Sequence, residues 1–403
     1  MAKNIGIHVF SEIGSLKRVL VKRPGRELSY LTPSNYKEWL FSNLIDWKIA
    51  AKEHDEFCKI LKSNGVEVVY IEDLLDETWK ATNDEVHTLF IKKFIKEANV
   101  KHIGYNEKIY RYLKSLSSRQ VFDAMICGIT TKDLKINNLN DVLVTIPMPN
   151  LYFTRDTFSS VGNSIVVSSM KHFVRKRETI FAWFIFTYHP IYKNTEKLLE
   201  RDAKNTIEGG DVFPINSETL MIGCSERTQL RSIKNLAQKI VNSVNTHFKK
   251  IYVVNVPHLP NLMHLDTWLT NVDYTKFIYS PNIHKSLKLW YADLTQPKIK
   301  FIKKKMSLLE YLNHMVGKKC QLIPVADDYS QVKIDIETNF DATNFLVIRP
   351  GVVVGYDRNE YTVNALRKAG VKVFAFSGSQ LSLGMGSCRC MSMPLERQDI
   401  KTK

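Results

Sequence analysis

The sequence contains no hydrophobic run long enough to cross a membrane. Its most apolar stretch, Ile180 to Tyr188, is about half the length of the roughly 20 residues that a spanning helix needs, and it includes the polar Thr187. The first residues, MAKNIGIHVF, lack the basic segment, apolar core and small-residue cleavage site of a secretory signal. These absences predict a cytoplasmic protein that does not associate with membranes.

Cysteine is scarce and shows no framework spacing. The 6 cysteines of the 403-residue chain are scattered, which predicts free thiols in a reducing compartment. Cys388 and Cys390 are separated by one residue, not by the two residues of a zinc knuckle, and no second close pair exists. We therefore expect neither a metal site nor a disulfide at this pair.

The net charge of +16 attracts phosphates in principle, but the basic residues are not concentrated. Lysines occur in short groups at 92–93, 249–250 and 303–305, and no arginine-rich arm or platform of interleaved aromatic and basic residues is present. This dispersal is typical of solvated faces and predicts no nucleic-acid partner. A binding protein that uses its basic surface on anionic partners is the alternative from a different functional class.

The sequence repeats one pattern of apolar strand, turn, second strand, helix and third strand. The clearest copy has strands over 344–348 and 352–356 around a Pro-Gly turn, a helix over 360–368 and a strand over 371–376. Related patterns occur near 16–71, 154–168, 211–256 and 264–279. Such a unit cannot bury its apolar face alone, so the copies must pack together. About five copies around an axis predict an α/β fold, a five-unit pseudo-symmetric propeller; a doubly wound parallel sheet is the alternative.

One segment interrupts the repeat. From about Asp73 to Asn138 strand signals are almost absent, and apolar residues recur at helical spacing over 85–97, 107–116 and 118–126. We therefore expect two domains. The divisions are an inserted α-helical domain at 73–139 and a catalytic α/β propeller domain at 1–72 and 140–403.

Four polar motifs at the predicted strand ends carry side chains that could do chemistry. They are Asn150-Leu-Tyr-Phe-Thr-Arg-Asp156, Glu208-Gly-Gly-Asp211, His264-Leu-Asp266 and the loop that contains Gly384, Gly386 and Cys390. On a strand, alternate residues such as His264 and Asp266 share a face. The glycines indicate close approach of the backbone to other groups. Each motif alone also has a structural explanation, as an acidic turn or a satisfied hydrogen-bonded pair.

Together the motifs supply a thiol, an imidazole and several carboxylates, a set that suits attack on a guanidinium carbon. A thiol with an ordinary pKa of about 8.5 is mostly protonated at neutral pH, so a nearby cation must activate it. Carboxylates oppose that activation unless they hold a cationic substrate, and a guanidinium is a planar fork of donors that they bind well. We therefore expect Cys390 to be a nucleophile beside Asp156 and Asp266, with His264 transferring protons.

Two arginines extend this interpretation. Arg175 and Arg227 follow Asp156 and Glu208 by the same interval of nineteen residues. Because arginine pairs with carboxylates through two parallel hydrogen bonds, these two suit a substrate with a carboxylate at one end and a guanidinium at the other, which is arginine itself. Salt bridges at the protein surface are the alternative explanation for both side chains.

Six motifs follow one another along the chain: NLYFTRD, EGGDVF, SERT, MHLDTW, RPGVVVGY and GMGSCRCMSMP. Together, from Ile7 to the C-terminus, they resemble bacterial arginine deiminase. The resemblance implies the pentein fold, a five-unit α/β propeller with an inserted helical domain, in a homodimer or larger homo-oligomer. It also implies hydrolysis of L-arginine to L-citrulline and ammonia in the arginine dihydrolase pathway, without a cofactor or metal.

The resemblance also implies a role for each site residue. Cys390 would form the covalent intermediate, His264 would be the general acid and base, and Glu208 would orient His264. Asp156 and Asp266 would hold the guanidinium. The residues that would clamp the substrate carboxylate, line the pocket or offer a backbone contact are Arg175, Arg227, Asn150, Phe153, Leu40 and Gly384.

The chain departs from the family pattern at a few positions. Ala326-Asp-Asp-Tyr329 stands where related enzymes have a glycine-rich stretch, and Ala342 stands where glycine is usual. Alanine at 342 is costly if the backbone there has positive φ. Cys388 adds a second thiol, and Met385 replaces an arginine found in some members. The alternatives are an agmatine or dimethylarginine hydrolase, or a diverged paralogue of low activity that acts as a binding protein.

Overall fold

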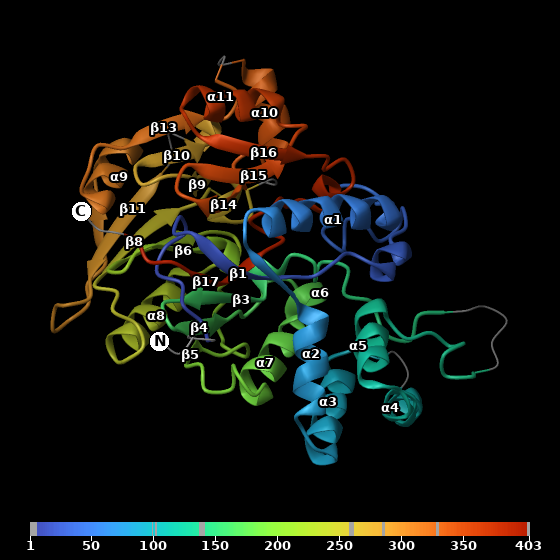
Figure 1. Ribbon diagram of the computed structural model, residues 1–403. Coiled ribbons are helices and arrows are strands. Elements are labelled where there is room, and N and C mark those ends of the chain that lie inside the picture. Colours follow the sequence, from blue (N-terminus) through green and yellow to red (C-terminus); the bar gives the residue numbers. More distant parts are fainter. Residues whose placement is uncertain are drawn as a thin grey trace.

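Five β-sheets share one pairing scheme in the computed structural model, which describes residues 6–98, 100, 103–136, 142–257, 262–283, 287–327 and 330–400 (Figure 1). In each sheet an antiparallel pair is followed by a third strand that runs parallel to the second. The triplets are β17 (Met393–Arg397), β1 (Leu16–Val21) and β2 (Glu67–Tyr70); β3 (Phe158–Val161), β4 (Ser164–Val167) and β5 (Lys197–Leu199); β6 (Val212–Asn216), β7 (Thr219–Cys224) and β8 (Lys250–Asn255); β9 (Leu269–Asn271), β10 (Lys276–Tyr279) and β13 (Gln321–Pro324); and β14 (Leu346–Arg349), β15 (Val352–Tyr356) and β16 (Lys372–Phe376). The repeat predicted from the sequence is confirmed, and a single doubly wound parallel sheet is excluded.

Helices connect the second and third strands of these sheets. They are α1 (Trp47–Ser63), α6 (Phe173–Lys176), α7 (Thr179–Tyr188), α8 (Leu230–Val241), α9 (Leu308–Val316) and α11 (Glu360–Lys368). Helix α11 has the bounds that the sequence predicted, and α8 lies within the predicted unit near 211–256. Two further strands, β11 (Lys288–Asp293) and β12 (Ile302–Lys304), widen the sheet of β6 to β8, and α10 (Gln331–Asn339) joins two sheets.

Local side-chain chemistry defines where the helices begin and end. The Asp46 side chain accepts hydrogen bonds from the first-turn N–H groups of α1, and Gly65, with a φ of 78°, follows its C-terminus. At α9, Ser307 and Glu310 form a capping box, and Gly317 closes the helix in the left-handed conformation. These signals fix the ends of both helices, of which the sequence predicted α1 within the unit near 16–71 and missed α9.

The sheet that contains both chain ends was predicted only in part. The sequence indicated β1 and β2, but its third strand, β17, comes from the C-terminus and pairs antiparallel with β1, with Leu20 opposite Met393. No local signal marks a strand partner that lies hundreds of residues away. This pairing draws the segment just before β17, which contains Cys390, into the interior of the molecule.

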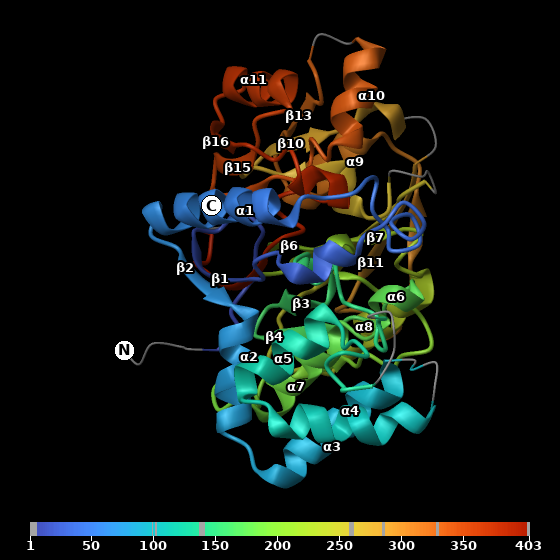
Figure 2. The same ribbon diagram turned by 90° about the vertical axis from the view of Figure 1, so that its right-hand side faces the viewer.

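The helices predicted within 73–138 are α3 (Asp84–Glu97), α4 (Asn106–Ser115) and α5 (Ser118–Cys127). The sequence missed α2 (Ile71–Lys80), which begins directly after β2. In both views these helices lie together at the end of the molecule opposite α11 (Figures 1 and 2). Their apolar faces share one buried cluster with α7, in which the rings of Phe90 and Phe184 are 4.3 Å apart.

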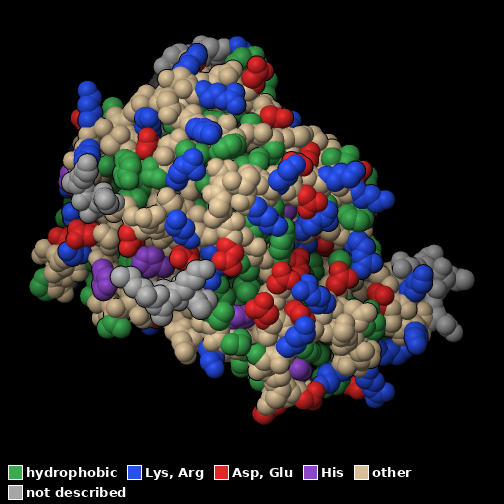
Figure 3. Space-filling view, in the orientation of Figure 1, with side chains coloured by type: hydrophobic (Ala, Val, Ile, Leu, Met, Phe, Trp, Pro, Cys, Tyr) green, Lys and Arg blue, Asp and Glu red, His purple; other side chains and the backbone are tan. Residues whose placement is uncertain are grey.

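The surface carries both signs of charge. On the face shown in Figure 3, lysine and arginine side chains are dispersed among aspartate and glutamate side chains. Among the described residues, the helices are all too short or too polar to span a bilayer.

Among the described residues, five other than glycine have positive φ. Ala326 is one of them, with a φ of 50°, in the segment where the related pattern is rich in glycine; the neighbouring residues 328–329, like the predicted domain boundary at 139–140, lie outside the described residues. Ala342 does not have positive φ, so the cost considered for alanine there does not arise; the left-handed residue is its neighbour Asp341, with a φ of 54°.

Phe90→Ala is expected to destabilise the protein by about 3–5 kcal/mol, because it empties space in the shared aromatic core. Phe90 is 0% exposed there. The free energy of unfolding from urea titration measures the effect. The matched control is the adjacent Leu89→Ala, whose side chain is 50% exposed and whose loss should change stability by less than about 0.5 kcal/mol. Equal effects of the two changes would contradict the packing described.

Candidate active site

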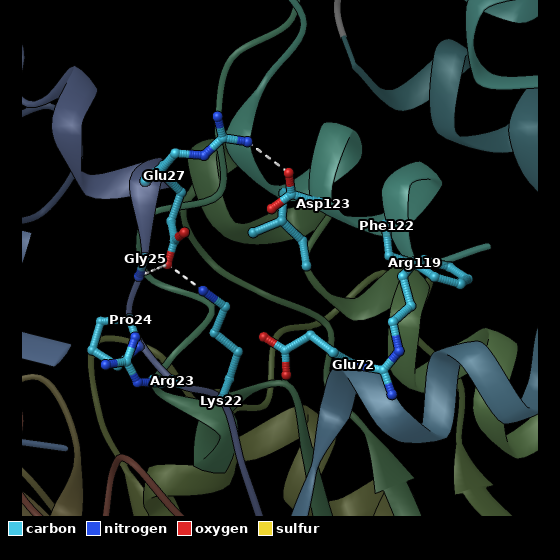
Figure 4. A pocket seen from close by; sticks show the side chains of 11 residues that line it. Lys22, Arg23, Pro24, Gly25, Glu27, Glu72, Arg119, Phe122 and Asp123 are labelled. Carbon is cyan, nitrogen blue, oxygen red and sulfur yellow. Dashed lines mark hydrogen bonds and ion pairs between the residues drawn. The ribbon is translucent and has the colours of Figure 1, made fainter. Parts of the chain in front are cut away.

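Two cavities in the described part of the chain differ sharply in their chemistry. The larger, about 320 Å³, lies where α2 and α5 meet the segment after β1 (Figure 4). Its charged lining is mutually neutralised, with ion pairs between Lys22 and Glu27 and between Arg26 and Asp123. No thiol or imidazole lines it. The second cavity, which contains a thiol and an imidazole, is therefore the candidate active site.

The second cavity gathers most of the candidate residues predicted from the sequence. It encloses about 10 Å³ and is lined by Leu40, Asn150, Phe153, Asp156, Arg175, Arg227, Met263, His264, Gly384, Met385 and Cys390. Glu208 and Asp266, both 0% exposed, lie directly behind this lining in contact with His264 and Cys390. Side chains more than two hundred residues apart in the chain therefore meet at one point.

Three short 3₁₀ helices present the acidic and imidazole groups. They are η3 (Thr154–Asp156), η4 (Gly209–Asp211) and η5 (Leu265–Thr267), which precede β3, β6 and β9 and contact one another in sequence. The prediction that His264 and Asp266 share a strand face was wrong. His264 immediately precedes η5 and Asp266 lies within it, so the two side chains have different partners.

His264 is held by two carboxylates. Its Nε2 lies 2.8 Å from Glu208 Oε2, and its Nδ1, which has no hydrogen-bond partner among the described residues, lies 3.8 Å from Asp156 Oδ1. Burial disfavours the imidazolium, but these carboxylates outweigh burial and raise the pKa of His264 to about 9. The imidazole is therefore protonated at neutral pH and can act as an acid.

Glycine is required beside this imidazole. A Cβ on Gly209 would lie 1.9 Å from the carbonyl oxygen of Arg155, and a Cβ on Gly210 would lie 2.6 Å from His264 Cγ. The close backbone approach that the sequence indicated for this motif is confirmed.

Each of the two cavity aspartates has one oxygen held by a buried arginine and one oxygen free. Arg175 Nη1 donates to Asp156 Oδ2 at 2.6 Å, and Arg389 Nη1 donates to Asp266 Oδ2 at 2.7 Å. Oδ1 of both aspartates is buried without a hydrogen-bond partner in the described structure. Since unpaired buried carboxylate oxygens are costly, these two positions favour a ligand that donates hydrogen bonds.

The two arginines predicted to bind a carboxylate are buried, so surface salt bridging is excluded as their role. Arg175 also donates to Glu178 and to the carbonyl oxygens of Asn150 and Phe153. The Arg227 guanidinium donates fewer hydrogen bonds than that of Arg175. Its Nη1 lies 3.4 Å from Glu208 Oε2, and its Nε has no hydrogen-bond acceptor among the described residues.

The cysteine loop is buried and held by hydrogen bonds. Cys390 is 3% exposed, and its backbone N–H donates to Asn344 Oδ1 at 3.0 Å. Cys390 Sγ lies 3.6 Å from Asp266 Oδ2. A Cβ on Gly384 would lie 1.7 Å from Tyr152 Oη, which confirms the close approach expected of the loop glycines.

The thiol of Cys390 is neutral in this state. Burial, together with the charges of Asp266, Asp156 and Asp341, raises its pKa well above the ordinary value. Glu208 has the opposite shift: burial opposes ionisation, but Arg227 and His264 lower the pKa of its carboxyl to about 2. The site therefore combines a protonated thiol, a cationic imidazole and ionised acids.

Sequence reasoning missed three residues that support the site. Asn344 anchors the cysteine loop, Arg389 holds Asp266, and Glu178 holds Arg175. The position of Arg389 next to the candidate nucleophile was a usable signal. No sequence signal indicated Asn344 or Glu178, because only the folded chain brings these residues to the site.

The chain is similar to known proteins over nearly its whole length. A family model described as arginine deiminase matches residues 37–397. The arginine deiminase of Metamycoplasma hominis is 45% identical over 404 residues, covering 98% of each chain. That of Metamycoplasma arthritidis is 45% identical over 405 residues, again covering 98% of each.

Solved structures with low sequence identity share the mixed α/β fold. SxtG, an amidinotransferase from Microseira wollei, aligns with a TM-score of 0.58 at 15% identity and covers 98% of both chains. DDAH from Pseudomonas aeruginosa, complexed with citrulline, aligns with a TM-score of 0.53 at 14% identity and covers 94% of this chain and 99% of its own. At such identities the likeness concerns the fold alone.

Replacing Glu208 with glutamine is expected to lower the pKa of His264, because it removes the carboxylate 2.8 Å from Nε2. NMR titration of the ring protons should show the wild-type imidazole losing its proton near pH 9 and the variant losing it at lower pH. The unfolded value is about 6.5, so the raised pKa stabilises the fold fully below that pH and this contribution disappears as pH rises through about 9.

The control for this titration is Glu226→Gln, which alters the carboxylate paired with His172 and should leave His264 unchanged. Identical titration of His264 in wild type and Glu208→Gln would show that the carboxylate does not set its protonation.

Proposed function

The chain belongs to the arginine deiminase family, whose members are hydrolases of amidine C–N bonds, and we propose that it converts L-arginine to L-citrulline and ammonia. The observation that carries this proposal is the pair of free carboxylate oxygens, Asp156 Oδ1 and Asp266 Oδ1, beside a thiol and an imidazole. A guanidinium is flat, cationic and rich in N–H donors, so it satisfies both oxygens at once.

The substrate guanidinium binds between Asp156 and Asp266. At its other end, the substrate carboxylate is bound by Arg227, whose Nε lies 3.8 Å from Glu226 Oε1 without an accepting partner at hydrogen-bond distance among the described residues, and by Arg175, which also lines the cavity. Asn150, Phe153 and Leu40 line the pocket, and Gly384 contributes a backbone contact. A cavity of about 10 Å³ holds roughly one water molecule, so the lining must move to admit arginine.

Two residues with a strained backbone mark where that movement occurs. Leu40 and Met385 line the cavity with φ values of 68° and 62°. Their segments are joined by hydrogen bonds from the N–H and hydroxyl groups of Ser42 to the Leu383 carbonyl oxygen. We expect both segments to open together when substrate enters.

Catalysis uses the substrate's own charge to ionise the thiol. The protonated Cys390 releases its proton to solvent and becomes a thiolate once the bound guanidinium offsets the surrounding carboxylates. The thiolate attacks the guanidinium carbon and forms a C–S bond. His264, protonated at neutral pH, supplies a proton to the departing nitrogen, and the C–N bond breaks to release ammonia.

The second half of the reaction reverses the role of the imidazole. His264, now neutral, takes a proton from water as the water oxygen attacks the same carbon. The C–S bond then breaks as the remaining proton of the water-derived hydroxyl leaves for solvent, which releases citrulline and the thiolate. The thiolate takes up a proton again once the cationic substrate is gone, which restores the resting thiol. Glu208 orients the imidazole through both steps and stabilises its charged form. No step in this sequence needs a metal or cofactor.

We extend the proposal to architecture and setting. The five sheets are the units of a pseudo-symmetric α/β propeller whose unit openings converge on the site, with 73–139 as an inserted helical domain in a catalytic domain of 1–72 and 140–403. The enzyme acts in arginine catabolism in the cytoplasm as a homodimer or larger homo-oligomer. Size-exclusion chromatography with light scattering tests the assembly.

Cys390→Ser should abolish citrulline formation from arginine, lowering kcat by on the order of 10³-fold or more, because the hydroxyl is a much weaker nucleophile. Cys388→Ser is the matched control. Cys388 lies two residues from Cys390 and is buried as well, at 0% exposed. It does not line the cavity, so most of the activity should remain in Cys388→Ser. Substantial activity in Cys390→Ser would overturn the mechanism.

Agmatine, which lacks the carboxylate of arginine, should be a very poor substrate. A site that leaves buried pairing groups unsatisfied rejects such an analogue by up to about 10⁴–10⁵ in kcat/KM. Arg227→Met should lower kcat/KM for arginine far more than for agmatine. Equal turnover of the two substrates by the wild type would contradict the carboxylate clamp and favour an agmatine hydrolase.

A further inference from the structure

Arg389 is the most completely buried cation at the site, and no step of the reaction uses it. It is 0% exposed, and its guanidinium lies 3.7 Å from the centre of the Phe213 ring. Besides Asp266, its donors reach the carbonyl oxygens of Gly210 and Val212 and both carboxylate oxygens of Glu12, at 3.0 to 3.2 Å. The acceptor oxygens of Asp266, Gly210, Val212 and Glu12 thus all accept hydrogen bonds from this one guanidinium.

We propose that Arg389 is a positioning residue that aims Asp266 at the substrate, and that Glu12 holds Arg389 in place. This inference rests on the proposed function, in which Asp266 binds the substrate guanidinium. Glu12 belongs to the segment before β1, far from the site in sequence, so the proposal adds a residue that no motif indicated.

The geometry explains why Asp266 presents one particular oxygen. Arg389 Nη1 occupies Oδ2 at 2.7 Å, which leaves Oδ1 as the oxygen available to a ligand. A carboxylate that is 0% exposed and loses its only hydrogen-bonded cation is strongly disfavoured in its ionised form. Without Arg389, Asp266 would lose the hydrogen bond that fixes its orientation and would bind a cationic substrate less well.

Arg389 also connects this carboxylate to the nucleophile. Its backbone N–H donates to the Asn344 carbonyl oxygen, and the next residue, Cys390, donates its N–H to the Asn344 side chain. The Asp266 oxygen that Arg389 binds is the one 3.6 Å from Cys390 Sγ. The Arg389 side chain therefore fixes the distance between Asp266, which binds the substrate guanidinium, and Cys390, which attacks it.

Glu12 balances a cluster of three buried arginines. It lies 3.1 Å from Arg389 and 3.5 Å from Arg155, and Arg397 acts on it from farther away. Burial opposes ionisation of Glu12, but these arginines outweigh burial and lower the pKa of its carboxyl. The charged and titratable groups around Asp266 are Arg389, Arg155, Cys390, Asp341 and His264. Among them Arg389 makes the direct cationic hydrogen bond.

The test is the pH profile of kcat and KM for citrulline formation by Arg389→Met. We expect KM for arginine to rise by on the order of 10²-fold at neutral pH, because one partner of a buried charge pair is removed. The acid limb of kcat/KM should move to higher pH, since an unpaired buried carboxylate is in general protonated more readily. Arg389→Lys, which keeps the charge, should restore most of the wild-type limb.

Two further variants separate positioning from a purely structural role. Arg201→Met is the matched control, since Arg201 also forms a buried pair, with both of its Nη atoms 2.6 Å from Glu97, away from the cavity lining. It should lower the unfolding temperature and leave the pH profile unchanged. Glu12→Gln should raise KM less than Arg389→Met and leave the acid limb in place, because the positive charge beside Asp266 remains.

The outcomes distinguish this inference from the proposed function. Absence of citrulline formation in the wild type would defeat the proposed function itself. An active wild type with an unchanged acid limb in Arg389→Met would overturn the positioning role alone. If Arg389→Met does not fold, the same profiles measured on Arg389→Lys and Glu12→Gln decide the matter: a KM unchanged in both would overturn the proposal.

Discussion

The site depends on one constraint: charged groups withdrawn from water must each find an opposite charge. Asp156, Asp266 and Glu208 are buried, and each is paired with an arginine within 3.4 Å. These pairs supply the stabilisation that hydration no longer provides. They also determine reactivity, because each paired aspartate keeps one oxygen that only a donor-rich ligand can satisfy.

The same constraint accounts for the protonation states. Acids surround both the thiol and the imidazole, which raises the pKa of Cys390 and of His264 alike. The resting site thus places a neutral thiol beside a cationic imidazole. In the proposed mechanism, a cationic substrate changes this balance by adding positive charge next to the thiol, so activation of Cys390 is linked to binding.

The repeated fold makes this arrangement attainable. The sheets beginning with β3, β6 and β9 each open with a short 3₁₀ helix, and these openings contact one another. Polar residues at the start of one unit therefore reach those of the next. The C-terminal strand β17 completes the sheet of β1 and β2 and brings Cys390 to the same place. Since the two chain ends share a sheet, loss of either end would remove part of the site.

The sequence by itself determined the repeated unit, the bounds of several helices and the polar cavity residues Asp156, His264 and Cys390, because periodicity and polar motifs are local. Leu40, Asn150, Phe153 and Gly384 were indicated by resemblance to a known family. Gly210 allows the backbone to approach His264 closely, and that role was readable from residue type. Only the tertiary structure decided the partners. It paired β17 with β1, seated His264 and Asp266 in a 3₁₀ segment, and placed Arg389 between Asp266 and Glu12. Such contacts depend on how distant segments pack. No local sequence pattern specifies which two buried charges will form a pair.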